Sequence, residues 1–456
     1  MTNSLKFGTS GLRGLATDLV GEESRRYAAA FLRYLRTRGP VSQILVGRDL
    51  RASSPDIARS VAAALDVEAI DCGELPTPAL ALEAMRRKAP AIMVTGSHIP
   101  ADRNGLKFYR ADGEIDKADE AGILAALGDG PEVNSSARAE LAALPRYLDR
   151  YAKLLDADAL RGKRIGVWQH SSVARDVFVE AVKMFGADVV ALGRSDTFIP
   201  VDTEAVAADT AAQLAAWVRE HKLDALISTD GDADRPLIVD ETGGLVRGDI
   251  IGILTAKFVK AEAVVTPVTS NSSIEGMGAF RKVIRTKVGS PFVIAGMGEA
   301  QGIVVGFEAN GGVLLGSDLS INGATITALP TRDALLPILS VLGAAQVAGK
   351  TVGELVATLP PRIARSDRLE HVPQERTAIL LDRLKSDAQG FLAGQGTIKD
   401  VSTIDGLRYE LTSGDVIHYR PSGNAPELRC YTEASTATRA DELLAWGLKA
   451  AEAVVR

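Results

Sequence analysis

A recurring pattern of apolar and polar positions organises most of the chain. Residues 42–80 hold a short apolar run, a polar loop, an amphipathic segment and a second apolar run. In the amphipathic segment, Ile57, Val61 and Leu65 recur at helical spacing, which predicts a helix between two strands. The same order returns over residues 163–202 and, more loosely, over residues 263–289. Alternating strands and helices indicate a mainly parallel sheet with helices on both faces.

The spacing of these segments indicates separate domains. They begin roughly a hundred residues apart, which is too long for the repeats of a solenoid. We therefore expect three related α/β domains with mixed, mainly parallel sheets, over residues 1–150, 151–250 and 251–362. A helix over residues 145–163 is expected to close the first domain. The remainder reads as strand, helix, several strands and a last helix, which predicts a smaller α+β domain over residues 363–456.

Composition narrows the class of protein. The 456 residues are 46% hydrophobic and 24% charged, which is typical of a soluble globular protein. The net charge of −6 and the lack of a basic run argue against nucleic-acid or membrane-surface partners. No apolar segment is long enough to cross a bilayer, and the first residues lack the apolar region of a signal peptide. The 2 cysteines are too few for a disulfide framework and fit a reducing cytoplasm.

The sequence TDGDADR is the strongest signal for a metal site. Asp230, Asp232 and Asp234 alternate in a loop, so three carboxylates can converge on one cation. Oxygen ligands alone suit Mg²⁺ or Ca²⁺. An EF-hand is excluded because Arg235 stands where its glycine belongs and the flanking segments read as strands. An acidic turn is the alternative, although Arg235 and Pro236 restrain the loop.

The stretch VTGSHIPADRNGLKF places Ser97 and His98 in a turn after an apolar run. A serine hydrolase is disfavoured because the G-x-S-x-G elbow is absent and His98 directly follows the serine. Ser97 is therefore either a structural residue of the turn or a carrier of phosphate. A phosphoserine beside the three aspartates would add oxygen ligands for Mg²⁺, and Lys107 could act as acid or base near the transferred oxygen.

Two further loops have residue types that bind sugar phosphates. In GFEANGG, Glu308 and Asn310 project from a glycine-rich loop and can exchange hydrogen bonds with neighbouring hydroxyl groups, with a plain hairpin as the alternative. In YRPSGNAPELRCY, guanidinium groups flank a hydroxyl and loop N–H groups, which together form a cradle for an oxyanion. A hairpin turn is again the alternative. The cradle comprises Arg420, Ser422, Gly423, Asn424 and Arg429.

Three arginines near the N-terminus are weaker candidates for phosphate contacts. Arg13 lies between glycines, and Arg48 and Arg51 follow a strand-like run. A solvated loop arginine is the alternative for each. The stretch GAAQVAGKTVGE is not a P-loop, because alanine replaces the first glycine that the loop requires. Thr351 and Glu354 instead fit a capping box at the start of a helix.

Six motifs occur in the order found in the α-D-phosphohexomutases, a family that the sequence resembles: GTSGLRG, GRDLRASS, TGSHIPADRNGLK, TDGDADR, GFEANGG and RPSGNAPELR. The resemblance covers essentially the whole chain. It implies three α/β domains of one topology and a smaller α+β fourth domain around a central cleft. It also implies interconversion of hexose 6-phosphate and hexose 1-phosphate through a phosphoserine, with Mg²⁺ and with a hexose 1,6-bisphosphate as intermediate and activator.

The resemblance also implies roles for the candidate residues. It makes Ser97 the phosphorylated serine, which also contacts the metal, and it gives as Mg²⁺ ligands Asp230, Asp232 and Asp234. The residues that assist around the phosphoserine are Lys107, Arg13, His98 and Arg235. The residues that bind the substrate are Lys287, Glu308, Asn310, Arg420, Ser422, Gly423, Asn424 and Arg429.

The sequence departs from the family pattern at several positions. The last motif commonly reads S-G-T-E-P, but here Asn424 and Ala425 replace the threonine and the glutamate. Some members have histidines at the positions of Gly312 and Ser290. The sugar loop favours mannose phosphates with some activity on glucose phosphates. Phosphoglucomutase, phosphoglucosamine mutase and a non-catalytic sugar-phosphate sensor are the alternatives. We expect small sugar phosphates as partners and a monomer or homodimer.

Overall fold

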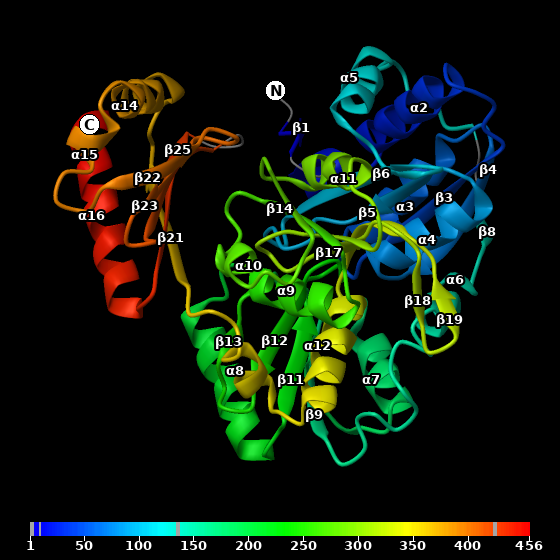
Figure 1. The fold of residues 1–456 in the computed structure, drawn as a ribbon. Helices are drawn as coiled ribbons and strands as arrows, with labels where there is room; N and C mark the ends of the chain where they lie inside the picture. The colour runs from blue at the N-terminus through cyan, green and yellow to red at the C-terminus, as the bar shows by residue number, and fades with distance from the viewer. Residues whose placement is uncertain (1–3, 9–10, 134–136, 423–425) are drawn as a thin grey trace.

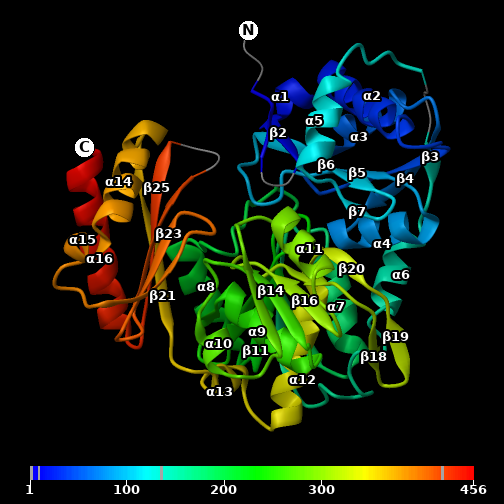
Figure 2. The ribbon, with the colours of Figure 1, turned by 45° about the horizontal axis from the view of Figure 1, so that its top comes forward.

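The computed structural model describes residues 4–8, 11–133, 137–422 and 426–456. In this part of the chain, four sheets of five or more strands form the framework, and a two-stranded hairpin accompanies them. Figures 1 and 2 show the C-terminal elements at one side of the other three sheets. Among the described residues, no helix has both the length and the apolar content that a membrane span needs.

An eight-stranded sheet forms the N-terminal domain. Its order is β1 (Lys6–Phe7), β2 (Leu12–Leu15), β6 (Arg103–Arg110), β5 (Ala91–Val94), β3 (Gln43–Arg48), β4 (Glu68–Glu74) and β8 (Arg138–Ala139), with β7 (Gly113–Glu114) paired to β6. Pairing is parallel from β5 to β8 and antiparallel elsewhere. The helices are α1 (Ala16–Leu19), α2 (Glu22–Arg36), α3 (Ser54–Ala63), α4 (Thr77–Arg87), α5 (Lys117–Ala125) and α6 (Ala143–Asp149).

The second and third sheets share one plan, with two parallel pairs followed by two antiparallel pairs. The second runs β10 (Asp188–Arg194), β9 (Arg164–His170), β11 (Ala225–Thr229), β12 (Pro236–Asp240) and β13 (Leu245–Val246). The third runs β15 (Lys282–Thr286), β14 (Ala263–Pro267), β16 (Val304–Phe307), β17 (Val313–Leu315) and β20 (Leu329–Asp333), and the hairpin comprises β18 (Leu319–Ile321) and β19 (Ala324–Ile326).

Helices accompany both of these sheets. The second domain has α7 (Arg175–Met184) and α8 (Ala208–His221). The third has α9 (Gly248–Phe258), α10 (Ser273–Gly276), α11 (Ser290–Gly298), α12 (Leu335–Ala348) and α13 (Val352–Val356). Thr351 and Glu354 form a capping box at the start of α13, which confirms the helix predicted there in place of a P-loop.

The three related α/β domains with mixed sheets are confirmed, but parallel pairs are fewer than the sequence pattern predicts. The reason is that β11 turns directly into β12, and β16 into β17, without an intervening helix. A direct turn can only join antiparallel neighbours. These two turns carry TDGDADR and GFEANGG, so both motifs lie at strand ends.

The C-terminal domain has an antiparallel sheet, as the α+β prediction requires. Its order is β21 (Ile363–Glu370), β25 (Glu427–Ala434), β24 (Val416–Pro421), β23 (Leu407–Leu411) and β22 (Ile398–Ser402). The accompanying helices are α14 (Gln374–Ser386), α15 (Ala388–Phe391) and α16 (Ala437–Val455). The predicted order of strand, helix, strands and last helix is therefore observed.

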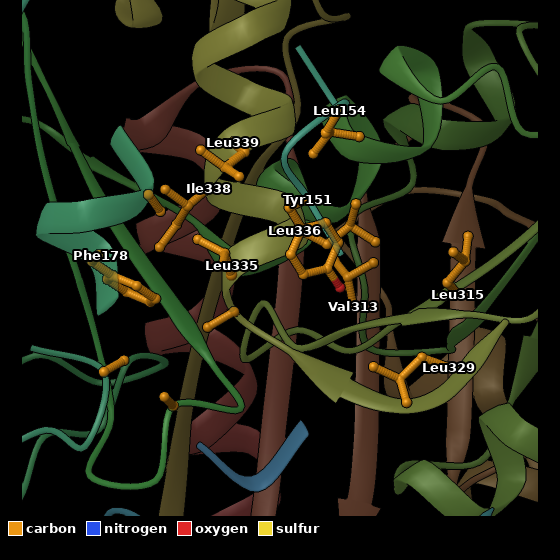
Figure 3. Packing of buried hydrophobic residues seen from close by; sticks show 14 of the residues in the cluster. Tyr151, Leu154, Phe178, Val313, Leu315, Leu329, Leu335, Leu336, Ile338 and Leu339 are labelled. Carbon is orange, nitrogen blue, oxygen red and sulfur yellow. The ribbon is translucent and has the colours of Figure 1, made fainter. Parts of the chain in front are cut away.

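One large hydrophobic cluster joins the first three domains. It contains apolar side chains from β5, β9, β11, β16 and β17, and much of α12. This helix is apolar nearly all round, which is typical of a helix surrounded by protein. Figure 3 shows its side chains Leu335, Leu336 and Leu339 in the same cluster as Tyr151 and Val313. The C-terminal domain has a separate cluster, built around Leu380, Leu411, Ile417, Tyr419 and Leu443.

A buried carboxylate holds the end of the first domain against the third. Asp333 accepts hydrogen bonds from the hydroxyl groups of Tyr147, at 2.7 Å, and Tyr151, and from the backbone N–H of Leu335. The predicted helix over residues 145–163 is wrong in extent, because α6 ends at Asp149 and turns follow. Burial and the Asp333 carboxylate raise the pKa of both tyrosines well above the usual range.

We expect Asp333→Ala to lower the free energy of unfolding by about 3 kcal/mol, because two buried tyrosine hydroxyls lose their acceptor. Urea unfolding followed by circular dichroism would measure the change. Asp156→Ala is the control, since Asp156 is exposed and should change stability by less than about 0.5 kcal/mol. Equal stability of the two variants would contradict the role given to Asp333.

Candidate active site

Ser97 lies in the loop between β5 and β6, where its side chain is buried. Its φ of +52° falls in the left-handed region that non-glycine residues rarely adopt. Arg51 holds this loop by donating to the carbonyl oxygens of Ser97 (2.9 Å), Ile99 (2.7 Å), Pro100 (2.7 Å) and Arg103 (2.8 Å). These charge-assisted hydrogen bonds fix the backbone around the serine.

Arg51 has no donor left for the phosphate contact considered for it. The remaining donor of Arg51, Nε, lies 3.2 Å from the carboxylate of Asp49, so all five N–H groups of its guanidinium bind protein oxygens. The ring of Phe198, from the second domain, stacks on the same guanidinium at 4.0 Å. Arg48 pairs with Asp71 at 2.9 Å. Arg51 is therefore a brace for the Ser97 loop.

The aspartate loop between β11 and β12 meets Ser97 directly. Ser97 Oγ donates to Asp230 Oδ2 at 2.6 Å. Lys107, on β6, donates to one oxygen of Asp232 and one of Asp234, both at 2.6 Å. Carboxylate oxygens of the three aspartates lie within 4.8 Å of one another, and all three residues are buried. A residue from the first domain thus pairs with a loop of the second in the interior.

Thr77 at the start of α4 fixes the same loop. Its hydroxyl donates to Asp232 Oδ2 at 2.5 Å, and its N–H donates to the Asp232 carbonyl oxygen at 2.9 Å. Sequence reasoning missed this residue, because a threonine at a helix start is common and its partner lies far along the chain.

The charges in this cluster shift the pKa of its members in different directions. Burial, followed by the charges of Asp232 and Asp234, holds the pKa of Asp230 well above its usual range. Burial also acts to raise the pKa of Asp234, but Arg332 and Lys107 outweigh it and lower that pKa. For Lys107, burial favours the neutral amine, yet Asp232 and Asp234 raise its pKa, so it stays an ammonium.

Arg235 and Arg13 add positive charge beside the aspartates. Arg235 Nε lies 3.7 Å from Asp234 and 4.0 Å from Asp230. This nitrogen is buried, and no described residue accepts a hydrogen bond from it. Burial, together with the charges of Arg235 and Arg332, lowers the pKa of Arg13 to about 10. Both predicted neighbours of the serine therefore belong to the same electrostatic environment.

His98 contacts the hydroxyl of its neighbour, as expected of a residue beside the serine. Its Nδ1 lies 3.2 Å from Ser97 Oγ. Burial and the positive charges of Arg235 and Arg13 lower the pKa of His98 to about 2, so the imidazole is neutral. The hydroxyl proton nevertheless points to Asp230, at the shorter distance of 2.6 Å.

The glycine-rich loop of the third domain reaches this cluster through an arginine that sequence reasoning missed. Glu308 and Asn310 are both buried in the turn between β16 and β17. Arg332, on β20, bridges Glu308 Oε2 at 3.1 Å and Asp234 Oδ2 at 2.9 Å. The signal for it was the charged pair Arg332-Asp333 inside the apolar run LPTRDALLPIL, since buried charges require partners.

A second group of candidate residues gathers where the third and fourth domains meet. Arg420 on β24 is directly opposite Arg429 on β25, which is opposite Arg368 on β21, so three arginines stand in a row. Like charges in register are unfavourable unless an anion or carboxylates compensate them. Asp405 compensates Arg420 at 2.7 Å and also accepts the N–H of Val288, at 3.0 Å, from the loop of the third domain.

The other predicted residues of this group are placed as follows. Ser422 is buried at the end of β24, and the ammonium of Lys287 lies 5.9 Å from the ring centroid of Phe292. The predicted substrate contacts of Gly423 and Asn424 lie outside the described residues. Lys287 adjoins Val288, so the contact of Asp405 with that loop brings Lys287 near the row of arginines.

Comparisons with known proteins identify the family of the chain. Three domain models of phosphoglucomutase/phosphomannomutase match: alpha/beta/alpha domain I at residues 4–132, domain II at 145–244 and domain III at 247–363. A phosphomannomutase of Sinorhizobium fredii is 48% identical, covering 97% of this chain and 98% of the relative. One of Salmonella muenchen is 44% identical, covering 95% and 93%.

Solved structures show the same fold. The structure of a phosphoglucomutase/phosphomannomutase family protein from Burkholderia thailandensis superposes with a TM-score of 0.78 at 21% identity, covering 98% of each chain. The matched domains, the two close relatives and the fold lead to one conclusion. The chain belongs to the phosphoglucomutase/phosphomannomutase family, whose members are phosphohexomutases.

Proposed function

We propose that this phosphohexomutase acts chiefly on mannose phosphates, interconverting the 6-phosphate and the 1-phosphate, with glucose phosphates as a secondary substrate. The observation that carries the reaction type is the 2.6 Å contact between Ser97 Oγ and Asp230 inside a buried cluster of charges. The names of the two closely similar relatives support the choice of mannose. A sensor without catalysis would not need a serine held in a strained conformation against three carboxylates.

The reaction we propose transfers a phosphoryl group from phosphorylated Ser97. A free hydroxyl of the hexose monophosphate forms the new bond to phosphorus as the bond to Ser97 Oγ breaks. The net movement of the proton is from the sugar hydroxyl to Ser97 Oγ. The resulting hexose 1,6-bisphosphate turns over in the site and returns its other phosphoryl group to Ser97, so the same bisphosphate can also act as an activator.

The charged side chains have separate roles in this proposal. Lys107 and Arg235 stabilise the charge that develops on the transferring group. Arg13 contributes to the same field, and the neutral His98 meets the phosphoryl group beside Ser97. Glu308 and Asn310 bind sugar hydroxyls in both orientations of the intermediate. The substrate's second phosphate is bound by the group Lys287, Arg420, Ser422, Gly423, Asn424 and Arg429.

The aspartate loop fits a divalent cation. Asp232 Oδ1 and Asp234 Oδ1 are buried and have no hydrogen-bond partner among the described residues, which is costly unless a cation binds them. Oxygen-only ligands within 4.8 Å of one another suit Mg²⁺, which we propose is held by Asp230, Asp232, Asp234 and the phosphoryl group on Ser97. When bound, Mg²⁺ neutralises charge on the transferring phosphoryl group.

Incubation with a hexose 1,6-bisphosphate should make the wild-type protein heavier by one phosphoryl group, as measured by intact mass. Ser97→Ala should show no such gain and should lose turnover by on the order of a thousandfold or more, since the acceptor oxygen is gone. Ser273→Ala, which alters another buried serine, should behave as the wild type. A mass gain that persists in Ser97→Ala would overturn the assignment.

Turnover of mannose 1-phosphate should exceed that of glucose 1-phosphate, and both should exceed glucosamine 1-phosphate. The comparison is made as kcat/KM with Mg²⁺ and the bisphosphate activator. A higher kcat/KM for glucosamine 1-phosphate would show that the preferred substrate is the amino sugar phosphate and not mannose phosphate. No turnover of any of the three by phosphorylated protein would favour the sensor.

Mg²⁺ should raise the stability of the wild type by about 2.7 kcal/mol at a hundredfold excess over its Kd, because a ligand that binds only the folded state stabilises it. Thermal unfolding with Mg²⁺ and after chelation would measure this. In Asp232→Asn the increase should largely disappear, whereas Asp156→Asn, at an exposed aspartate, should retain it. The same increase in Asp232→Asn would place the cation elsewhere.

A further inference from the structure

Arg332 is the only described residue that the contacts above place on both the aspartate loop and the sugar loop. Its guanidinium lies with Nη2 at 2.9 Å and Nε at 3.2 Å from Asp234 Oδ2, and with Nη1 at 3.1 Å from Glu308 Oε2. The side chain is nearly fully buried, at 4% exposure. A planar guanidinium presents its N–H groups in fixed directions, so it can hold two carboxylates in one mutual geometry.

Gly312 provides the space that this arginine occupies. A Cβ atom at position 312 would lie 2.6 Å from Cδ of Arg332, 2.7 Å from Cγ and 3.0 Å from Cβ. Approaches this short do not occur between real carbon atoms, so the arginine would have to move. A side chain at position 312 and the observed conformation of Arg332 therefore exclude each other. The glycine and the arginine form one structural unit.

Arg332 determines which oxygen of Asp234 faces the cation site. It shares Asp234 Oδ2 with Lys107, whose Nζ is at 2.6 Å. The other oxygen, Oδ1, is buried and accepts no hydrogen bond from the part of the chain that the structure describes. Two cationic donors on one oxygen thus leave the second oxygen for a metal ion. At its other end, Arg332 similarly fixes one oxygen of Glu308, on the loop proposed to bind the sugar.

We propose that Arg332, made possible by Gly312, is a positioning residue that couples cation binding at Asp234 to sugar recognition at Glu308. The proposal rests on the function proposed above. Because one rigid group holds both carboxylates, an ion that orders Asp234 also orders Glu308 for the sugar phosphate. Linkage then requires that the sugar phosphate strengthens cation binding by the same factor.

Direct binding measurements test the coupling. Calorimetry would give the Kd of Mg²⁺ alone, and the Kd of mannose 1-phosphate with and without Mg²⁺, each in a Ser97→Ala background that prevents turnover. Arg332→Lys should weaken both ligands by about tenfold, because a lysine cannot bridge the two carboxylates. It should also remove most of the dependence of sugar-phosphate affinity on Mg²⁺. Arg281→Lys, at an exposed arginine of the same domain, should change neither affinity.

The role of the glycine is tested by a double-mutant cycle. Gly312→Ala should weaken both ligands much as Arg332→Lys does, since the methyl group displaces the arginine. In an Arg332→Ala background, Gly312→Ala should have little further effect, because neither the guanidinium nor the Cγ and Cδ atoms remain to be displaced. Additive losses, or a Gly312→Ala variant that binds as the wild type, would overturn the link between the two residues.

A merely structural role predicts different results. Arg332→Lys would then lower the melting temperature but leave the ratio of sugar-phosphate affinities with and without Mg²⁺ unchanged, and this would overturn the proposal. Intact mass and turnover of the wild type report separately on the proposed function. If the wild type turns over none of the three hexose 1-phosphates, the proposed function is wrong. If Arg332→Lys binds Mg²⁺ as tightly as the wild type does, the proposed coupling is wrong, whatever the result for turnover.

Discussion

The structure depends on the pairing of buried charges around the aspartate loop. Carboxylates that are removed from water need cationic partners close by, or the folded state pays their full desolvation penalty. Asp232 and Asp234 find those partners on other domains, in Lys107 of the first and Arg332 of the third. The relative placement of three sheets is therefore tied to this cluster as well as to the large apolar core that they share.

The loop that carries Ser97 needs support of its own from the surrounding protein. Ser97 has a left-handed backbone conformation, which costs free energy for a residue with a side chain. Arg51 compensates with its hydrogen bonds to the loop carbonyl groups, and Phe198 covers it from the second domain. Ser97 Oγ is thus held in a fixed position by the surrounding protein, as preorganised sites require.

The sequence predicted the parts of the site that are local and left out the parts that are long-range. Asp230, Asp232 and Asp234 are close in sequence, and their loop could be read from spacing alone. The repeated strand and helix pattern likewise predicted the α/β domains. Arg332 was missed because its partners lie 98 and 24 residues away, and no local rule relates such positions.

Two predictions from the sequence pattern failed: the length of one helix and the share of parallel strand pairs. The helix expected to run to residue 163 ends early, and the turns that follow include Tyr151, which hydrogen-bonds with Asp333. The prediction that the sheets are mainly parallel failed because β11 and β12, and β16 and β17, are joined by direct turns. In the first case a tertiary contact outweighed a local pattern, and in the second a direct turn replaced the helix that parallel pairing requires.

The separate hydrophobic cluster of the C-terminal domain has an evolutionary consequence. Its apolar core is not continuous with the core that the other domains share, and polar contacts such as Asp405 with Val288 join the two parts. Interfaces of this polar kind tolerate sequence drift and relative motion. Selection can therefore change the row of arginines without disturbing the surroundings of Ser97. A change at Ser97 must instead be matched at Asp230, its hydrogen-bond partner in the second domain.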